Sequence, residues 1–266
     1  GLTIGILDGS GMLVASLAGE PKAPRIANDF NIVGRIASSR QVWAVRSRAP
    51  FQSIADVLQA AAQRAIVFGT LNVASLSFCN IVIASHLLGV DAEIVSGYRG
   101  SKAGVLAVQR GDVEIVCYSF ESIRRHIESG AIKPILQISD EPISPHPLLQ
   151  DVPILGGADG LAHLRSREMG RDPREAELDV NTLMGIIDVG RLIVAPKGLT
   201  PEKARCLAQA LFETLATPNF RKAATKAKRS LEVGDAESVN ASLQVVARRV
   251  DVFRQLIQGA IRRLLS

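Results

Sequence analysis

Short runs of β-type residues alternate with helical segments along most of this 266-residue chain, and each run ends in a loop rich in Gly, Ser, Thr or Asn. Between residues 66 and 130 the pattern recurs at Ile66–Phe68, Glu93–Val95 and Glu114–Tyr118. Strands that alternate with helices in this way are typical of α/β proteins with crossover helices. The sequence therefore predicts an α/β fold with mainly parallel sheets flanked by helices.

The loops after these strands carry candidate ligand-binding groups. Thr70, Leu71, Asn72 and Ser75 follow the first strand of the series, and Ser119 follows the third. A helix N-terminus presents unpaired backbone N–H groups that bind anions, and the carboxyl ends of neighbouring parallel strands meet at one sheet edge. A single Ser or Thr at such a position is also an ordinary helix cap. The cluster as a whole exceeds what one cap needs and indicates a site for a small anion.

Two further features add to this candidate site. The loop Asp8-Gly9-Ser10-Gly11 follows a strand predicted over Thr3–Leu7, so Gly9 and Ser10 are candidates of the same kind. Arg191 begins another predicted strand, and an arginine there is able to pair a carboxylate with two hydrogen bonds. A surface arginine at a strand edge is the competing interpretation.

Composition and charge exclude several classes of protein. The net charge is +5, with 31 basic and 26 acidic residues, but the basic residues are scattered and lack interleaved aromatics, which argues against nucleic-acid binding. No apolar run approaches the roughly 18 residues of a membrane span, so the protein is not expected to be embedded in a membrane. No signal peptide is present in the given sequence.

Signatures of catalysis are missing from the sequence, and we expect neither an enzyme nor a cofactor. The chain has no nucleophile elbow, no phosphate-binding Gly-Lys-Ser/Thr loop and no dinucleotide glycine fingerprint. The four histidines, His86, His126, His146 and His163, lack metal-ligand spacing, so no metal site is expected. His86 and His126 fall near predicted helix C-termini. Cys117 and Cys206 are interpreted, with Cys79, as structural thiols.

Local signals place several helices. Ser53 with Asp56 forms a predicted capping box, and Thr200-Pro201 and Thr217-Pro218 are strong helix starts. Residues 158–188 are interpreted as a polar excursion across the surface. A long final helix is expected from Asp235, with its apolar residues at three- and four-residue steps.

Several motifs resemble the substrate-binding receptors of tripartite tricarboxylate transporters, the Bug-type periplasmic receptors. No single motif is decisive, and their order and spacing from Leu2 to Ile257 carry the resemblance. The matching segments are Phe68-Gly69-Thr70, Gly97-Tyr98-Arg99-Gly100, Gly111–Glu114, Ser119, Ile127–Pro134, Leu148–Pro153, Gly190-Arg191 and Val194–Pro201.

The resemblance implies a two-lobed, type II (Venus-flytrap) periplasmic binding protein that holds a small organic carboxylate between its lobes for membrane transporter subunits. Residues 1–44 and 191–266 would form one lobe and residues 45–190 the other, with crossings near Gln41–Arg46 and Arg191–Ala195. Carried over by position, the ligand contacts would come from Asp8-Gly9-Ser10 in the first lobe. In the second lobe they would come from Thr70, Leu71, Asn72 and Ser119.

One departure from the family concerns the start of the sequence. Members of the family normally begin with a strand and a glycine-rich loop that opens the first helix, and Gly1 aligns where their third strand begins. About 60 residues, or two strand–helix units, are therefore expected to be missing from the first lobe. Such a loss would leave a sheet edge uncovered.

Two other functions were weighed against the receptor. An effector-sensing domain of a LysR-type transcription regulator has a similar fold, but it would need an N-terminal helix-turn-helix, and none is present before Thr3. An enzyme would have to use Cys117 and His126, which are poorly arranged for catalysis. A periplasmic solute-binding receptor for a small carboxylate is the preferred hypothesis.

Overall fold

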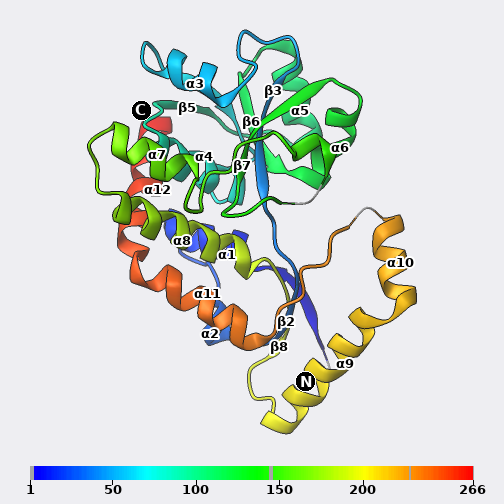
Figure 1. The fold of residues 1–266 in the computed structure, drawn as a ribbon. Coiled ribbons are helices and arrows are strands. Elements are labelled where there is room, and N and C mark those ends of the chain that lie inside the picture. Colours follow the sequence, from blue (N-terminus) through cyan, green and yellow to red (C-terminus); the bar gives the residue numbers. More distant parts are fainter. Residues whose placement is uncertain (1–2, 144–145, 228, 266) are drawn as a thin grey trace.

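The computed structural model describes residues 3–143, 146–227 and 229–265, and its strands form two separate sheets (Figure 1). A three-stranded sheet has the order β1-β8-β2, and a five-stranded sheet has the order β5-β4-β6-β3-β7. The strands are β1 (Gly5–Asp8), β2 (Phe30–Ala37), β3 (Gln41–Arg46), β4 (Ile66–Gly69), β5 (Ala92–Val95), β6 (Ile115–Ser119), β7 (Ile132–Ile138) and β8 (Arg191–Pro196). The α/β class expected from the sequence is confirmed.

Helices cover both sheets. They are α1 (Gly9–Ala18), α2 (Ile26–Asp29), α3 (Ile54–Ala61), α4 (Leu76–Leu88), α5 (Ser101–Arg110), α6 (Phe120–Glu128), α7 (Leu161–Glu168), α8 (Pro173–Val189), α9 (Pro201–Ala216), α10 (Pro218–Lys226), α11 (Ala236–Arg248) and α12 (Val250–Leu265), with a 3₁₀ turn at Pro147–Leu149. Of these, α1, α3, α4, α5, α6 and α9 each come next after a strand along the chain. Among the residues that the structure describes, none of these helices combines the length and apolar character that a membrane span requires.

The pairing of the strands is mixed, which corrects the expectation of mainly parallel sheets. In the described part of the chain, parallel pairing is limited to β4 with β5 and β4 with β6. The three-stranded sheet is antiparallel throughout, and β3 runs against both of its neighbours, β6 and β7. The repeated strand–helix units of residues 66–119 produce the parallel part. Strand β3 instead enters from the other sheet through residues 38–40, so it runs in the opposite direction.

The five-stranded sheet is buried on both faces. Helices α5 and α6 pack on one face against Val42, Val116 and Tyr118, while α3 and α4 pack on the other face, which carries Trp43 and Phe68. The rings of Trp43 and Phe68 meet edge to face with their centroids 4.8 Å apart. Burial on both faces explains why these strands read as short, continuous apolar runs.

The three-stranded sheet is covered less completely. Helices α1, α2 and α11 pack against the face that carries Leu192 and Val194, and α9 packs against the opposite face at Val33 and Ile193. Strand β1 lies at the edge of this sheet, and its Ile6 side chain is 66% exposed.

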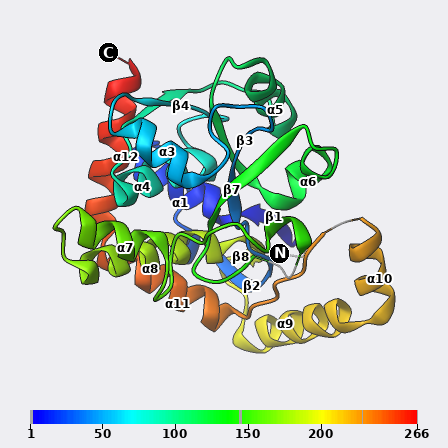
Figure 2. The ribbon, with the colours of Figure 1, turned by 45° about the horizontal axis from the view of Figure 1, so that its top comes forward.

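Five helices, α1, α4, α7, α8 and α12, share one core with a face of the five-stranded sheet, and α1 also contacts β8 of the three-stranded sheet (Figure 2). Helix α8 contributes Leu183, Ile186 and Ile187 to this core, and all three are fully buried. The interpretation of residues 158–188 as a surface excursion is therefore wrong for α8. Its polar residues misled the sequence analysis, because they lie at the first two turns and the buried residues follow them.

The predicted long final helix is divided into α11 and α12, which corrects another expectation. Arg249 ends α11 with a non-helical backbone, and its guanidinium pairs with Asp179 at 2.7 Å and with Glu175 at 2.8 Å. Burial raises the pKa of Asp179, and the neighbouring Arg249 opposes this shift. The bend lets α11 cover the three-stranded sheet while α12 packs on α1 and α4.

The local helix signals are confirmed where they were strongest. Ser53 and Asp56 form the predicted capping box at the start of α3. Helices α9 and α10 begin at Pro201 and Pro218, directly after their predicted threonine caps. In Figure 1, α10 stands apart from the rest of the molecule and is joined to it through α9 and the segment that leads into α11.

Candidate functional site

Three hydroxyl groups meet at the start of α4. The Oγ1 atom of Thr70 lies 2.7 Å from the Oγ of Ser77 and 3.4 Å from the Oγ of Ser75. Thr70 is fully buried, and Ser75 accepts a hydrogen bond from the backbone N–H of Phe78 as the helix cap. These hydroxyls are engaged with one another, so they stabilise the entry into α4, and their binding to a ligand stays a prediction.

Leu71 and Asn72 lie in the same loop but have different surroundings. The carbonyl of Leu71 accepts a hydrogen bond from the N–H of Gly97, which joins the loops after β4 and β5. The side chain of Asn72 is exposed, and its Oδ1 accepts from the N–H of Ala74 at 3.0 Å in a local turn. Their roles as ligand contacts also stay predictions.

Ser119 ends β6 and stands at the N-terminus of α6. Its side chain forms no capping hydrogen bond. It pairs across the sheet with Gln41, the first residue of β3, which follows residues 38–40. Ser119 thus lies beside the connection that links the three-stranded and five-stranded sheets.

Gly9 and Ser10 lie at the start of α1, beside the three-stranded sheet, and their hydrogen-bonding groups have partners within the protein. Ser10 is fully buried, and its hydroxyl donates to the carbonyl of Ile186 at 2.7 Å and accepts from the N–H of Gly190 at 2.9 Å. The N–H of Gly9 donates to the carbonyl of Gly190 at 2.8 Å. These groups join α1 to the end of α8. Their assignment to ligand binding stays a prediction, but in this structure their hydrogen-bonding capacity is already used.

Arg191 is the first residue of β8 and is exposed. It pairs in register with Asp8 on β1 and with Ala37 on β2. The structure therefore places Gly9, Ser10 and Arg191 on the elements of one sheet. The remaining predicted residues lie at the carboxyl edge of the other.

A cleft of about 650 Å³ lies between α6 and the segment from α10 to α11, and we call it the arginine cleft. One wall comes from the first turns of α6 and from the segment before the 3₁₀ turn, and the other comes from α10 and the residues after it. Its lining residues are Phe120, Glu121, Arg124, Ile143, His146, Arg221, Ala224, Thr225, Arg229, Ser230, Leu231, Glu232 and Val233. The hydroxyl of Ser230 donates to the carboxylate of Glu121 across the cleft.

The arginine cleft carries an excess of positive charge. Its lining has three arginines against two glutamates, and Arg124 is paired with Glu128 outside the lining at 2.6 Å. Among the residues that the structure describes, the side chains of Arg221 and Arg229 have neither a hydrogen bond nor an ion pair. The N-terminus of α6 also opens at this wall, and its free N–H groups add positive potential. A small anion is the ligand that these groups favour.

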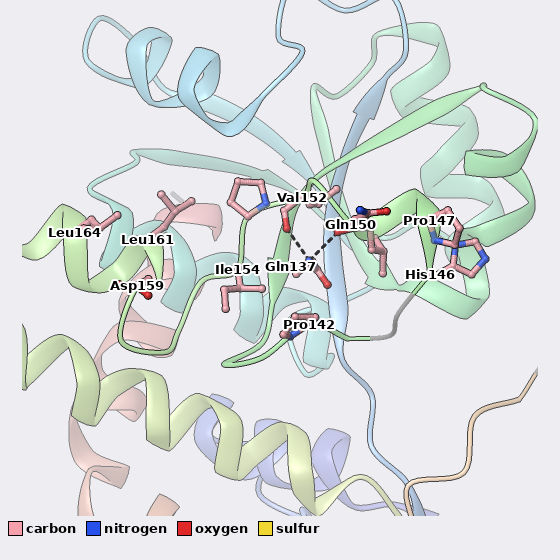
Figure 3. A pocket seen from close by; sticks show the side chains of 12 residues that line it. Gln137, Pro142, His146, Pro147, Gln150, Val152, Ile154, Asp159, Leu161 and Leu164 are labelled. Atoms are coloured by element: carbon pink, nitrogen blue, oxygen red, sulfur yellow. Dashed lines mark hydrogen bonds between the residues drawn. The ribbon is translucent and has the colours of Figure 1, made fainter.

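A second, larger cavity of about 820 Å³ has the opposite character (Figure 3). Apolar side chains such as Ile154 and Leu161 dominate its wall, and among the described residues that line it Asp159 is the one acidic side chain. The side chain of Gln137 is buried there and donates to the carbonyls of Val152 and Leu149, at 2.6 and 3.2 Å. Among the described residues that line this cavity there is neither a lysine nor an arginine, so the cavity is less suited to a carboxylate than the arginine cleft is.

The thiols and histidines do not form a catalytic arrangement in the described residues. Burial raises the pKa of the Cys79 thiol to about 12 and raises that of Cys117 well above its ordinary value. Both thiols are therefore protonated at neutral pH. Burial lowers the pKa of His86, with Arg171 adding to the shift. Within the described ranges no group of His, Cys, Asp and Glu is arranged to hold a metal ion.

The arginines of the cleft were missed in the sequence analysis. Arg124 lies on α6, whereas Arg221 and Arg229 are about a hundred residues further along the chain. Each of them reads as an ordinary solvated residue of its own segment. A cluster of basic residues after Thr217-Pro218 was the available signal, but nothing local showed that it would face α6.

Comparison with known proteins adds to this geometry. The sequence matches no protein-family model and no curated protein. The fold matches a TctC solute-binding protein from Polaromonas over 96% of this chain and 77% of that one, with a TM-score of 0.68 and 19% identity. The periplasmic binding protein BugD aligns over 95% and 77%, with a TM-score of 0.66 and 18% identity.

A third neighbour was solved with a ligand. MatC from Rhodopseudomonas palustris, with bound malate, aligns over 96% of this chain and 78% of its own, with a TM-score of 0.61 and 18% identity. At these identities the comparison establishes the fold. The chain has the α/β fold of TctC and Bug solute-binding proteins, which the order of its motifs had indicated. These comparisons do not favour the regulator domain that was weighed as an alternative.

Proposed function

We propose that this protein is a solute-binding receptor that captures a small organic carboxylate in the arginine cleft. The observation that carries the proposal is the pair of guanidiniums, Arg221 and Arg229, which have no partner among the described residues and line a cleft of about 650 Å³ together with the first turns of α6. Guanidinium groups bind carboxylates with two parallel hydrogen bonds, and a helix N-terminus binds a second anionic group. The cleft volume lies in the range of small-molecule sites.

The fold gives this proposal its biological setting. TctC, BugD and malate-bound MatC are solute-binding proteins, and the protein is proposed to act as they do, in the periplasm and with membrane transporter subunits as partners. Two lobes, residues 1–44 with 191–266 and residues 45–190, are part of the same proposal. The ligand carboxylate would also approach Ser119, which precedes the first turn of α6.

Ligand binding by the wild-type protein is the direct test. Malate, succinate and adipate are titrated in a thermal-shift assay, with neutral succinamide as the matched control. A ligand at one hundred times its Kd stabilises the folded state by about 2.7 kcal/mol. For a chain of this size the melting temperature then rises by about 5–10 °C. If no mono-, di- or tricarboxylate raises it, the proposal is rejected.

Variants test the position of the site. Arg221→Gln and Arg229→Gln each remove a charged donor, and we expect the Kd for the binding carboxylate to rise about tenfold, equivalent to about 1.4 kcal/mol. Arg254→Gln is the matched control, because this arginine lies on α12 and pairs with Asp251. Binding that survives both cleft substitutions, with Ser119→Ala or Thr70→Ala weakening it instead, would place the ligand at the α4 and α6 loops.

A further inference from the structure

Arg40 occupies the connection between the two sheets. It is the last of three residues, 38–40, that lead from β2 of the three-stranded sheet to β3 of the five-stranded sheet. Its side chain is only 14% exposed. A long cationic side chain that is buried at such a place needs charged partners, because an unpaired buried charge is costly.

Three carboxylates from separate segments surround the Arg40 guanidinium. Its Nη1 atom lies 3.0 Å from Asp140, its Nη2 atom 3.5 Å from Asp188, and its Nε atom 3.7 Å from Glu232. Asp140 follows β7 of the five-stranded sheet, whereas Asp188 is on α8 beside the three-stranded sheet. The N–H of Glu232 donates to the carbonyl of Ile36 on β2. A single side chain thus contacts segments that belong to both sheets.

The charge balance makes Arg40 necessary to this cluster. Burial works to lower the pKa of Arg40, but the three carboxylates together raise it above its ordinary value. Burial raises the pKa of Asp188, and Arg40 and Arg35 oppose that shift. Arg35 donates to the backbone carbonyls of Asp188 and Glu232. Without Arg40, the three carboxylates would lose the guanidinium with which all of them pair.

Of these three carboxylates, Glu232 belongs to one wall of the arginine cleft, and Asp140 lies on the segment that leads to the other wall. Glu232 lines the cleft itself, and the hydroxyl of Ser38 also holds its carboxylate. Asp140 stands three residues before Ile143, which lines the opposite wall. We propose that Arg40 is a positioning residue that sets the width of the arginine cleft, because it holds together the segments that carry the two walls. This inference rests on the proposed function for its purpose, but the geometry can be tested without any ligand.

The experiment measures the distance across the cleft in the full chain. Spin labels are placed at Arg125→Cys on α6 and Glu237→Cys on α11, both exposed positions, in a Cys206→Ser background. The remaining thiols, Cys79 and Cys117, are buried and free. Pulsed electron resonance then compares Arg40→Met with the parent protein, with Arg254→Met as the control substitution.

We expect Arg40→Met to lengthen or broaden the distance by more than about 2 Å, because the two walls lose their shared partner. Arg40→Lys keeps the charge and is expected to restore part of the parent distribution. An unchanged distance in a folded Arg40→Met protein overturns the inference. If that variant does not fold, Asp140→Asn decides the matter, since its carboxylate is 41% exposed and only one wall is released.

A binding arm separates this inference from the proposed function. If malate binds the parent protein, Arg40→Met is expected to raise its Kd about tenfold while Arg254→Met does not. If no carboxylate binds the parent protein, the proposed function fails, and the distance measurement still decides the role of Arg40.

Discussion

Replacing Ser10 by alanine separates a structural role from a role in binding. The Ser10 hydroxyl is fully buried, donates to the carbonyl of Ile186 at 2.7 Å and accepts from the N–H of Gly190 at 2.9 Å. Gly190 leads α8 into β8 with a positive φ of 58°, and a Cβ there would lie 2.1 Å from the carbonyl oxygen of Ala37. The substitution therefore removes two hydrogen bonds at a junction where the backbone has little room to adjust.

The expected loss of stability in Ser10→Ala follows from the buried polar groups that the substitution leaves without a partner. A lost hydrogen bond costs about 1 kcal/mol, and a buried N–H left without a partner costs about 1–3 kcal/mol. Ser10→Ala is thus expected to lower the free energy of unfolding by about 3 kcal/mol. With an m-value of about 3 kcal/mol per molar in urea, the unfolding midpoint falls by about 1 M.

Urea unfolding followed by circular dichroism measures this change. Ser16→Ala is the matched control, because Ser16 is exposed on the same helix and its substitution is expected to change stability by less than about 0.5 kcal/mol. A Ser10→Ala midpoint equal to that of the control would refute the reasoning. So would a variant that keeps its midpoint but loses the response to carboxylates, since this would make the hydroxyl a ligand contact.

Two ion pairs give further predictions. Burial works to raise the pKa of Glu114, but hydrogen bonds from Arg64 and from a backbone N–H of β4 lower it. Its stabilising contribution is therefore present above the ordinary carboxyl pKa and lost as pH falls through the folded value, so Glu114→Gln is expected to flatten the loss of stability below about pH 5 in urea unfolding. Arg249→Met leaves the buried Asp179 carboxylate unpaired and is expected to cost about 3 kcal/mol at neutral pH. An Arg249→Met melting temperature equal to that of Arg254→Met would contradict this.

Predictions from the sequence succeeded where neighbouring residues decide the conformation. The Ser53–Asp56 capping box and the proline starts of α9 and α10 are all present. Each depends on hydrogen bonds or dihedral limits within a few residues. The apolar runs that predicted strands also became strands, because burial on both faces of a sheet produces that pattern.

Predictions failed where distant segments decide the outcome. The antiparallel placement of β3 depends on its entry from the other sheet, and the break at Arg249 depends on Asp179 and Glu175, about 70 residues earlier. Helix α8 was assigned to the surface from its polar first turns, although four other helices bury its second half. None of these partners is visible in the local sequence.

In the candidate site, too, the local sequence determined some features and the tertiary structure determined others. The sequence by itself determined where hydroxyl-rich loops stand at helix N-termini, since serine, threonine and asparagine favour helix N-cap positions and glycine permits the turn that ends a strand. The tertiary structure decided which of these hydroxyls already have hydrogen-bond partners within the protein. The Ser10 hydroxyl is bonded to the end of α8, and the Thr70 hydroxyl is bonded to that of Ser77. It also decided that Arg221 and Arg229 line one cleft with the first turns of α6, because α9 packs on the three-stranded sheet and the segment after α10 is hydrogen-bonded to β2.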